Sequence, residues 1–162
     1  MDLLTQSLEG NRDRKKIRVR WYGAQNQLVN PVLEIKNKKG LETRKETYKI
    51  SELDGLKFPD FKNLDLIKNT VNLQKKSKNT ILPILTTNYD RQYFVSNNGK
   101  IRATIDYNLK SIHLKNPSQM EIVKIFSSTC ILEIKYPTNL DKYVRLNLKE
   151  ITLRLSKNSK YI

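Results

Sequence analysis

Arginine alternates with apolar residues in the segment "KKIRVRWYG" at residues 15–23. With the period of two of a β-strand, Arg18 and Arg20 share one face and apolar residues take the other. Two cations about 7 Å apart on one strand face repel by about 2 kcal/mol at an effective dielectric near 20. Arginine also presents a rigid fork that matches phosphate oxygens. Water and counterions can offset the charge of one such strand, so the interpretation depends on whether other strands repeat the pattern.

Further segments with strand periodicity place polar residues on one face in the same way. These residues are Glu34, Lys36 and Lys38; Thr43, Lys45 and Thr47; Tyr89, Arg91 and Tyr93; Arg102, Thr104 and Asp106; and Glu133 and Lys135. Two arrangements fit this pattern: an antiparallel sheet whose polar face meets water, or a closed barrel whose charged side chains point inward around a polyanion. Tyrosines at positions 22, 89, 93 and 107 could stack on bases, so an RNA-binding barrel remains an alternative.

The bulk composition favours an anionic partner and excludes several kinds of site. The chain has 162 residues and a formal net charge of +15, from 31 Lys+Arg against 16 Asp+Glu. An AT-rich genome could produce the same abundance of Lys, Asn and Ile. Cys130 and His113 are the only residues of their types, which excludes an intrachain disulfide and a cysteine zinc site. Phosphate-binding glycine loops and kinase motifs are absent from the sequence.

The N-terminus and the apolar runs indicate where the protein works. "MDLLTQSLEG" has neither a basic start nor a long apolar run, as a secretion signal would. No apolar stretch approaches the roughly 18 residues of a membrane span. We therefore expect a cytoplasmic protein without a membrane segment.

The elements expected to hold these residues form one α+β domain, dominated by antiparallel strands. Strands are predicted at 15–22, 32–38, 43–50, 81–95, 100–109 and 129–137, and helices at 61–76 and from Asp141 onward. Gly40 suits a hairpin loop, and Asn98-Gly99 is the strongest hairpin signal in the chain. Residues 110–127 are ambiguous between helix and strand.

Seven short segments, taken in order, resemble one known family. They are "KIRVRWYG", "LEIK", "TRKE", "YDRQYF", "IRATIDYNL", "ILEIKYP" and "SKNSKYI", and together they span residues 15–162. The ordered set resembles the VTC domain, a polyphosphate polymerase module of the CYTH-like superfamily of triphosphate tunnel metalloenzymes. The resemblance implies an antiparallel β-barrel with flanking helices, whose tunnel binds triphosphate.

The resemblance also implies roles for particular residues. The implied catalytic cations are Arg18, Arg20, Lys36, Lys45, Arg91, Arg102 and Lys160. Tyr89, Lys135 and Ser159 would bind substrate. Glu133 would hold a divalent metal, either manganese or magnesium, and Glu34 is its main rival for that role.

By the same resemblance, the protein would transfer the γ-phosphate of ATP to a polyphosphate chain. Its partners would be ATP and polyphosphate or triphosphate, with no nucleic acid, and a membrane partner protein stays open. The alternatives are a triphosphatase and a non-catalytic polyphosphate- or nucleotide-binding module. The family's first strands have no counterpart before residue 15, so we expect a single domain at 1–162 that is truncated at its N-terminus and has a barrel open on one side.

Overall fold

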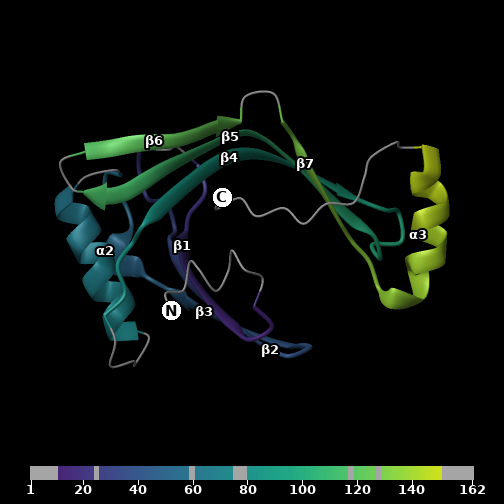
Figure 1. Cartoon of the computed structure of the whole chain (residues 1–162), viewed down its shortest axis with the longest axis horizontal. Helices are drawn as coiled ribbons and strands as arrows, with labels where there is room; N and C mark the ends of the chain where they lie inside the picture. The colour runs from purple at the N-terminus through teal and green to yellow at the C-terminus, as the bar shows by residue number, and fades with distance from the viewer. Residues whose placement is uncertain are drawn as a thin grey trace. The chain divides into compact units, whose positions relative to one another are not determined.

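The computed structural model describes residues 11–23, 26–58, 61–74, 80–116, 119–126 and 129–150 (Figure 1). The chain divides into two compact units between Ile84 and Leu85. Each unit contains one antiparallel sheet. Among the described residues, no helix is both long enough and apolar enough to span a membrane.

The N-terminal unit is built on a three-stranded sheet in the order β1-β2-β3. Its strands are β1 (Arg14–Arg20), β2 (Val32–Lys39) and β3 (Glu42–Lys49). The β2–β3 hairpin turns at Gly40, whose φ of 59° is a conformation that glycine adopts without steric cost. All three strands confirm the sequence prediction to within two residues at each end.

The apolar face of this sheet forms the core of the unit. Leu33 and Ile35 of β2 are buried there together with Leu28, Ile50, Leu53 and Phe58. Helix α2 (Phe61–Gln74) adds the buried Ile67 and Val71, which are four residues apart and so lie on one side of the helix. This helix confirms the one predicted at 61–76. Because period-two alternation puts the apolar residues of β1 and β2 into this core, the basic residues at positions 14, 16, 18 and 20 of β1 and at 36 and 38 of β2 lie on the opposite face.

The C-terminal unit is organised around one long strand, β5 (Arg102–Asn116). Strand β4 (Leu85–Val95) pairs with most of its length, β6 (Gln119–Phe126) with its second half and β7 (Ile131–Lys135) with its first half. The β4–β5 turn contains Gly99, with a φ of 70°, at the predicted Asn98-Gly99 hairpin. Asn98 supports the turn, since its side-chain oxygen accepts a hydrogen bond from the backbone N–H of Lys100 at 3.0 Å.

A short helical segment follows β7. It consists of the 3-10 turn η2 (Thr138–Leu140), helix α3 (Asp141–Asn147) and the 3-10 turn η3 (Leu148–Glu150), and a further turn, η1 (Ser51–Leu53), lies in the N-terminal unit. Asp141 in the first turn of α3 accepts hydrogen bonds from Tyr136 and Arg145. The predicted continuation of this helix beyond residue 150 lies outside the described residues.

Some sequence predictions need correction. The strand predicted at 100–109 continues to Asn116, and the ambiguous segment 110–127 supplies the rest of β5 and all of β6. Pairing with β4 and β6 decides this segment, because its local pattern alone fits either helix or strand. The α+β class is confirmed, but the described strands form two sheets and no closed barrel is found among them.

Candidate functional site

A strongly basic face covers the N-terminal sheet on the side away from its core. The register pairs Arg14 with Lys38, Lys16 with Lys36, and Lys36 with Lys45. We define the basic face as Arg14, Lys16, Arg18, Arg20, Lys36, Lys38 and Lys45. The four residues that the sequence assigned to catalysis in this unit (Arg18, Arg20, Lys36 and Lys45) therefore share one face of one sheet.

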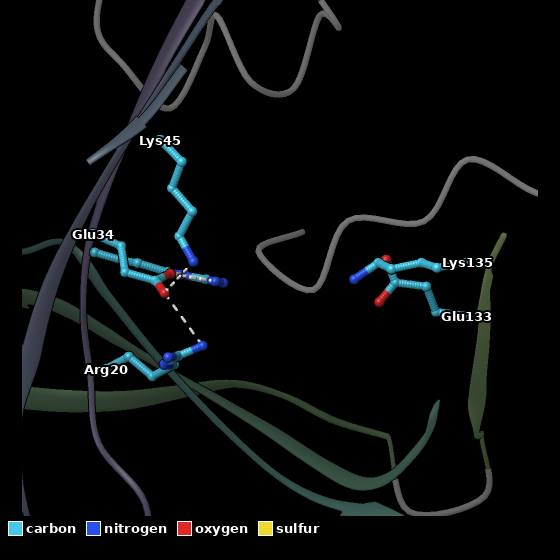
Figure 2. Close-up of polar contacts among 6 residues, drawn as sticks. Arg20, Glu34, Lys45, Glu133 and Lys135 are labelled. Carbon is cyan, nitrogen blue, oxygen red and sulfur yellow. Dashed lines mark hydrogen bonds and ion pairs between the residues drawn. The ribbon is translucent and has the colours of Figure 1, made fainter. Parts of the chain in front are cut away.

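The buried carboxylate of Glu34 forms ion pairs with three of these cations (Figure 2). Its side chain is only 3% exposed. Arg18 donates from Nε to Oε2 at 2.6 Å, Lys45 Nζ lies 2.7 Å from Oε1, and Arg20 Nη1 lies 3.3 Å from Oε1. We call Glu34, Arg18, Arg20 and Lys45 the Glu34 cluster. The cations come from β1 and β3 and converge on one point of β2.

The environment of Glu34 keeps its carboxyl group ionised. Burial alone raises the pKa of this group, but hydrogen bonds from Lys45 and Arg18 and the charges of Arg18 and Arg20 together lower it by more. The net result is a pKa below the ordinary glutamate value. The carboxylate is therefore charged at neutral pH and holds the three cations together.

A pocket lies further along the basic face, toward the start of β1. It has a volume of about 70 Å³ and is lined by Arg14, Lys16, Lys36 and Lys38, so we call it the four-cation pocket. Burial lowers the pKa of Lys16, and the charges of Arg14 and Lys36 lower it further. This electrostatic environment favours an anion.

In the C-terminal unit, Arg91 forms a two-pronged ion pair with Asp106. Arg91 Nε lies 2.5 Å from Oδ1 and Nη2 lies 2.8 Å from Oδ2 of Asp106. The Asp106 side chain is fully buried, and that of Arg91 is 23% exposed. The rings of Tyr89 and Tyr93 lie 5.2 Å and 5.8 Å from the guanidinium carbon of Arg91. These contacts hold the guanidinium in one orientation.

The remaining candidates of this unit lie near the paired ends of β5 and β7. Arg102 is exposed and pairs in register with Lys135, while Thr104 pairs with Glu133. Glu133 Oε1 lies 3.2 Å from Lys135 Nζ, with side-chain exposures of 46% for Glu133 and 62% for Lys135 (Figure 2). An ion pair this exposed adds little stability, so the Glu133 carboxylate is accessible for another role.

Glu133 is the carboxylate to which the family resemblance assigns a divalent cation. The described part of the chain contains no group of three or more His, Cys, Asp or Glu side chains that could hold a metal. Magnesium, however, is commonly bound by one or two carboxylates together with water and substrate phosphates. The single, half-exposed carboxylate of Glu133 fits that mode of binding.

Two predicted site residues lie outside the described part of the chain, and three residues of the basic face and its cluster were not predicted in their observed roles. Ser159 and Lys160 lie outside the described residues. Sequence reasoning treated Glu34 as a rival metal ligand and missed that it is the centre of a cation cluster. It also missed Arg14 and Lys16, although both share the strand parity of Arg18 and Arg20 and could have been found by that signal.

Comparisons with known proteins identify the family. Neither the curated proteins nor the solved structures contain a match to this chain. The family model of the VTC domain matches residues 1–162, which is the whole chain. The ordered motifs, the basic strands and this match agree, and the chain belongs to the VTC domain family.

Proposed function

We propose that this protein binds triphosphate and polyphosphate on its basic residues and transfers the γ-phosphate of ATP to a polyphosphate chain. Membership of the VTC domain family indicates a polyphosphate-related role. One observation carries the more specific proposal: Arg18, Arg20 and Lys45 converge from two strands on a single buried anion, the Glu34 carboxylate. Cations that converge on a carboxylate oxygen are also arranged to bind a phosphate oxygen.

Phosphoryl transfer needs alignment and charge neutralisation more than covalent chemistry by the protein. In the proposed mechanism, Arg18 and Arg20 offer planar forks to the phosphate oxygens, and Lys45 adds a mobile point charge. Lys36 lies beside them on β2, one same-face position from Glu34, and it also lines the four-cation pocket. These side chains would hold the phosphate groups and offset the charge that spreads over them during transfer.

The predicted residues of the C-terminal unit would likewise act on phosphate groups. Asp106, Tyr89 and Tyr93 orient Arg91, so its guanidinium needs little reorganisation when phosphate arrives. Arg102, Lys135, Ser159 and Lys160 would add further phosphate contacts. Glu133 would hold the divalent metal, manganese or magnesium. When bound, this metal would neutralise phosphate charge and orient the phosphate oxygens.

The tyrosines support a phosphate ligand over RNA. Tyr22 lies against Arg20, with 5.0 Å from the guanidinium carbon to the ring centroid. Tyr89 and Tyr93 lie against Arg91. Each ring thus has an arginine against it, as expected where tyrosines help to orient phosphate-binding guanidinium groups. Tyr22 and Tyr93 are also 58% and 63% exposed, so competition by single-stranded RNA is the measurement that separates the two ligands. We also propose that the protein acts in the cytoplasm, because the proposed phosphate donor is ATP.

Ligand-dependent melting tests the binding step. Tripolyphosphate should raise the melting temperature more than orthophosphate at equal concentration, because a ligand of the native state adds about 2.7 kcal/mol at a hundredfold excess over Kd. Arg18→Glu should abolish the shift. Arg44→Glu is the control, because it makes the same charge change at a side chain of β3 that is 81% exposed and does not belong to the basic face. This variant should keep the ligand-dependent rise in melting temperature. Absence of any shift in the wild-type protein with millimolar tripolyphosphate would refute the proposal.

A product assay tests the transfer step. With ATP and manganese or magnesium, the proposal requires polyphosphate that grows with time. Release of orthophosphate alone would identify a triphosphatase. Binding without turnover of ATP would identify a non-catalytic module.

A further inference from the structure

We propose that Asn108 is a positioning residue of the candidate site in the C-terminal unit. It forms a β-bulge in β5, and this bulge keeps Asp106 on the side of the sheet where it orients Arg91. The effect on phosphate binding rests on the proposed function and deepens it, because it adds a residue that acts on phosphate only through Arg91. The effect on the orientation of Arg91 itself does not depend on that function.

The bulge is visible in the pairing of β4 with β5, which shifts by one residue at this point. As a result, Asn108 and Leu109 of β5 together oppose the single residue Tyr89 of β4, which is the arrangement of a β-bulge. It lies where β5 changes its second partner. Strand β7 pairs with residues 102–106, and β6 begins to pair at Leu109 (Figure 1).

The extra residue changes which side chains of β5 share a face. Asp106 lies opposite Arg91, and Ser111 lies opposite Thr87. Arg91 and Thr87 are four residues apart in β4 and share one face, so their partners Asp106 and Ser111 share that face too. Asp106 and Ser111 are five residues apart, which would put them on opposite faces of a regular strand. The bulge therefore joins two halves of β5 that have opposite parity.

Removal of the bulge would separate Asp106 from Arg91. If regular pairing continued from the second half of β5, Tyr107 would lie opposite Arg91, and Asp106 would turn to the other face. Arg102 has the parity of Asp106 and would turn with it. The second half should keep its register, because it buries Leu109, whereas the apolar residues of the first half are partly exposed. The bulge thus places two predicted catalytic arginines on one face.

Asn108 suits the bulge in two ways. Its φ of 53° lies in the left-handed region, which asparagine adopts more often than most residues with a side chain. Its side-chain amide also donates a hydrogen bond to Oδ2 of Asp90 at 2.7 Å. This hydrogen bond ties the bulge to the residue of β4 that directly precedes Arg91. Glycine could adopt the same backbone conformation but could not form this contact.

The test follows Arg91 directly, by the NMR signal of its side-chain Nε–H group in the full chain. Arg91→Lys removes this signal and so assigns it. Asn108→Val places a β-branched residue where the left-handed region is strongly disfavoured. In this variant we expect the Arg91 signal to shift and to exchange faster with water, because the contacts with Asp106 and the two tyrosine rings are lost. Asn108→Gly keeps the backbone conformation and should retain the signal.

The matched control is Asn30→Val. Asn30 has a φ of 46°, and in the described part of the chain it shares a positive φ with Asn108 and with glycines only. It lies in the N-terminal unit, so its replacement imposes the same kind of backbone strain without changing β5. The control should leave the Arg91 signal unchanged.

Binding of tripolyphosphate, measured by titration calorimetry, gives the functional readout. Asn108→Val should weaken binding about tenfold, as expected when one hydrogen bond to a charged group is lost. Asn108→Gly and Asn30→Val should stay within about twofold of wild type. In a background that carries Arg91→Met with Asp106→Leu, Asn108→Val should have no further effect, because Asn108 acts through Arg91.

The outcomes separate the positioning role from the proposed function. If the wild type does not bind tripolyphosphate, the proposed function fails, and the NMR comparison still decides the role of Asn108. If the wild type binds it and Asn108→Val keeps the Arg91 signal, the positioning role alone is refuted. An equal change of the signal in Asn30→Val, or no protected Arg91 signal in the wild type, would also refute that role. Thermal melting shows that the variants fold, and Asn108→Ala repeats both measurements if Asn108→Val does not fold.

Discussion

At the scale of single residues, Glu34 has the most informative environment in the described structure. It is a buried carboxylate that binds three cations from two neighbouring strands. Three clustered cations repel one another, and the carboxylate offsets this repulsion while no ligand is bound. Under the proposed function, phosphate would compete with this carboxylate for the cations, and a multivalent anion would have the advantage over a monovalent one.

Replacing Glu34 with glutamine should destabilise the unliganded protein by about 1–3 kcal/mol, because the buried partner of partly exposed cations is lost. Tripolyphosphate should restore much of the loss. Urea unfolding with and without ligand measures both effects. Glu46→Gln on the same sheet, whose side chain is 31% exposed, is the control and should change stability little. Equal losses in the two variants would show that the cluster adds no stability.

The stabilising effect of Glu34 should disappear in acid. Its folded-state pKa is lowered, so it contributes stability above its unfolded pKa, near 4.3, and this stability is lost as pH falls through the folded value. The difference in unfolding free energy between wild type and Glu34→Gln should therefore be full at pH 7 and should shrink progressively below about pH 4.3. A difference that stays constant to pH 2 would contradict this assignment.

Arg91 should be structural as well as functional. Arg91→Ala leaves the fully buried Asp106 without its bidentate partner, which should cost about 3–5 kcal/mol. The double variant Arg91→Met with Asp106→Leu should recover most of that stability, because it removes both charges while keeping volume. A double-mutant cycle by thermal melting measures the coupling. If Arg91→Ala has the melting temperature of the wild type, the ion pair between Arg91 and Asp106 does not stabilise the fold.

At the scale of elements, the apolar core holds the basic face in place from the other side of the sheet. Ile67 of α2 is 6% exposed and packs in the core to which Leu33 and Ile35 of β2 belong. Ile67→Ala should cost about 2–4 kcal/mol by leaving a cavity. Leu73→Ala, on the same helix at 80% exposure, should cost less than about 0.5 kcal/mol. Urea unfolding distinguishes the two, and similar costs would mean that α2 does not pack as described.

Local patterns predicted the elements well where one period was clear. Period two identified β1, β2 and β3, the helical spacing of Ile67 and Val71 identified α2, and Asn98-Gly99 marked the β4–β5 turn. The segment from 110 to 127 has no single period, and its strands depend on pairing partners far along the chain. The contact between Glu34 and its cations depends on strand register, which the sequence pattern alone does not specify.

At the scale of the whole molecule, net charge predicted the kind of partner but not how the charge is arranged. The +15 total is compatible with a dispersed surface, a groove or a closed barrel. Strand pairing shows that seven of the 31 basic residues lie on one sheet face of the N-terminal unit, and three of these seven contact one carboxylate. The closed barrel that the family resemblance implied depends on how strands close on one another, and no run of residues encodes that locally.

The pairing of β1 with β2 also restricts how this gene can change. The basic residues of β1 that belong to the basic face alternate with its apolar residues. Inserting or deleting one codon within the strand would therefore turn some of these basic residues toward the core and expose apolar residues in their place. The hairpin turn at Gly40 and Leu41 is under no such constraint, since loop tips accept insertions. In a library of single-codon insertions, we therefore expect folded survivors at residues 40–41 and none at 16–19. Substitutions that keep parity should be far better tolerated, so this sheet should diverge by exchange of side chains and not by change of strand length.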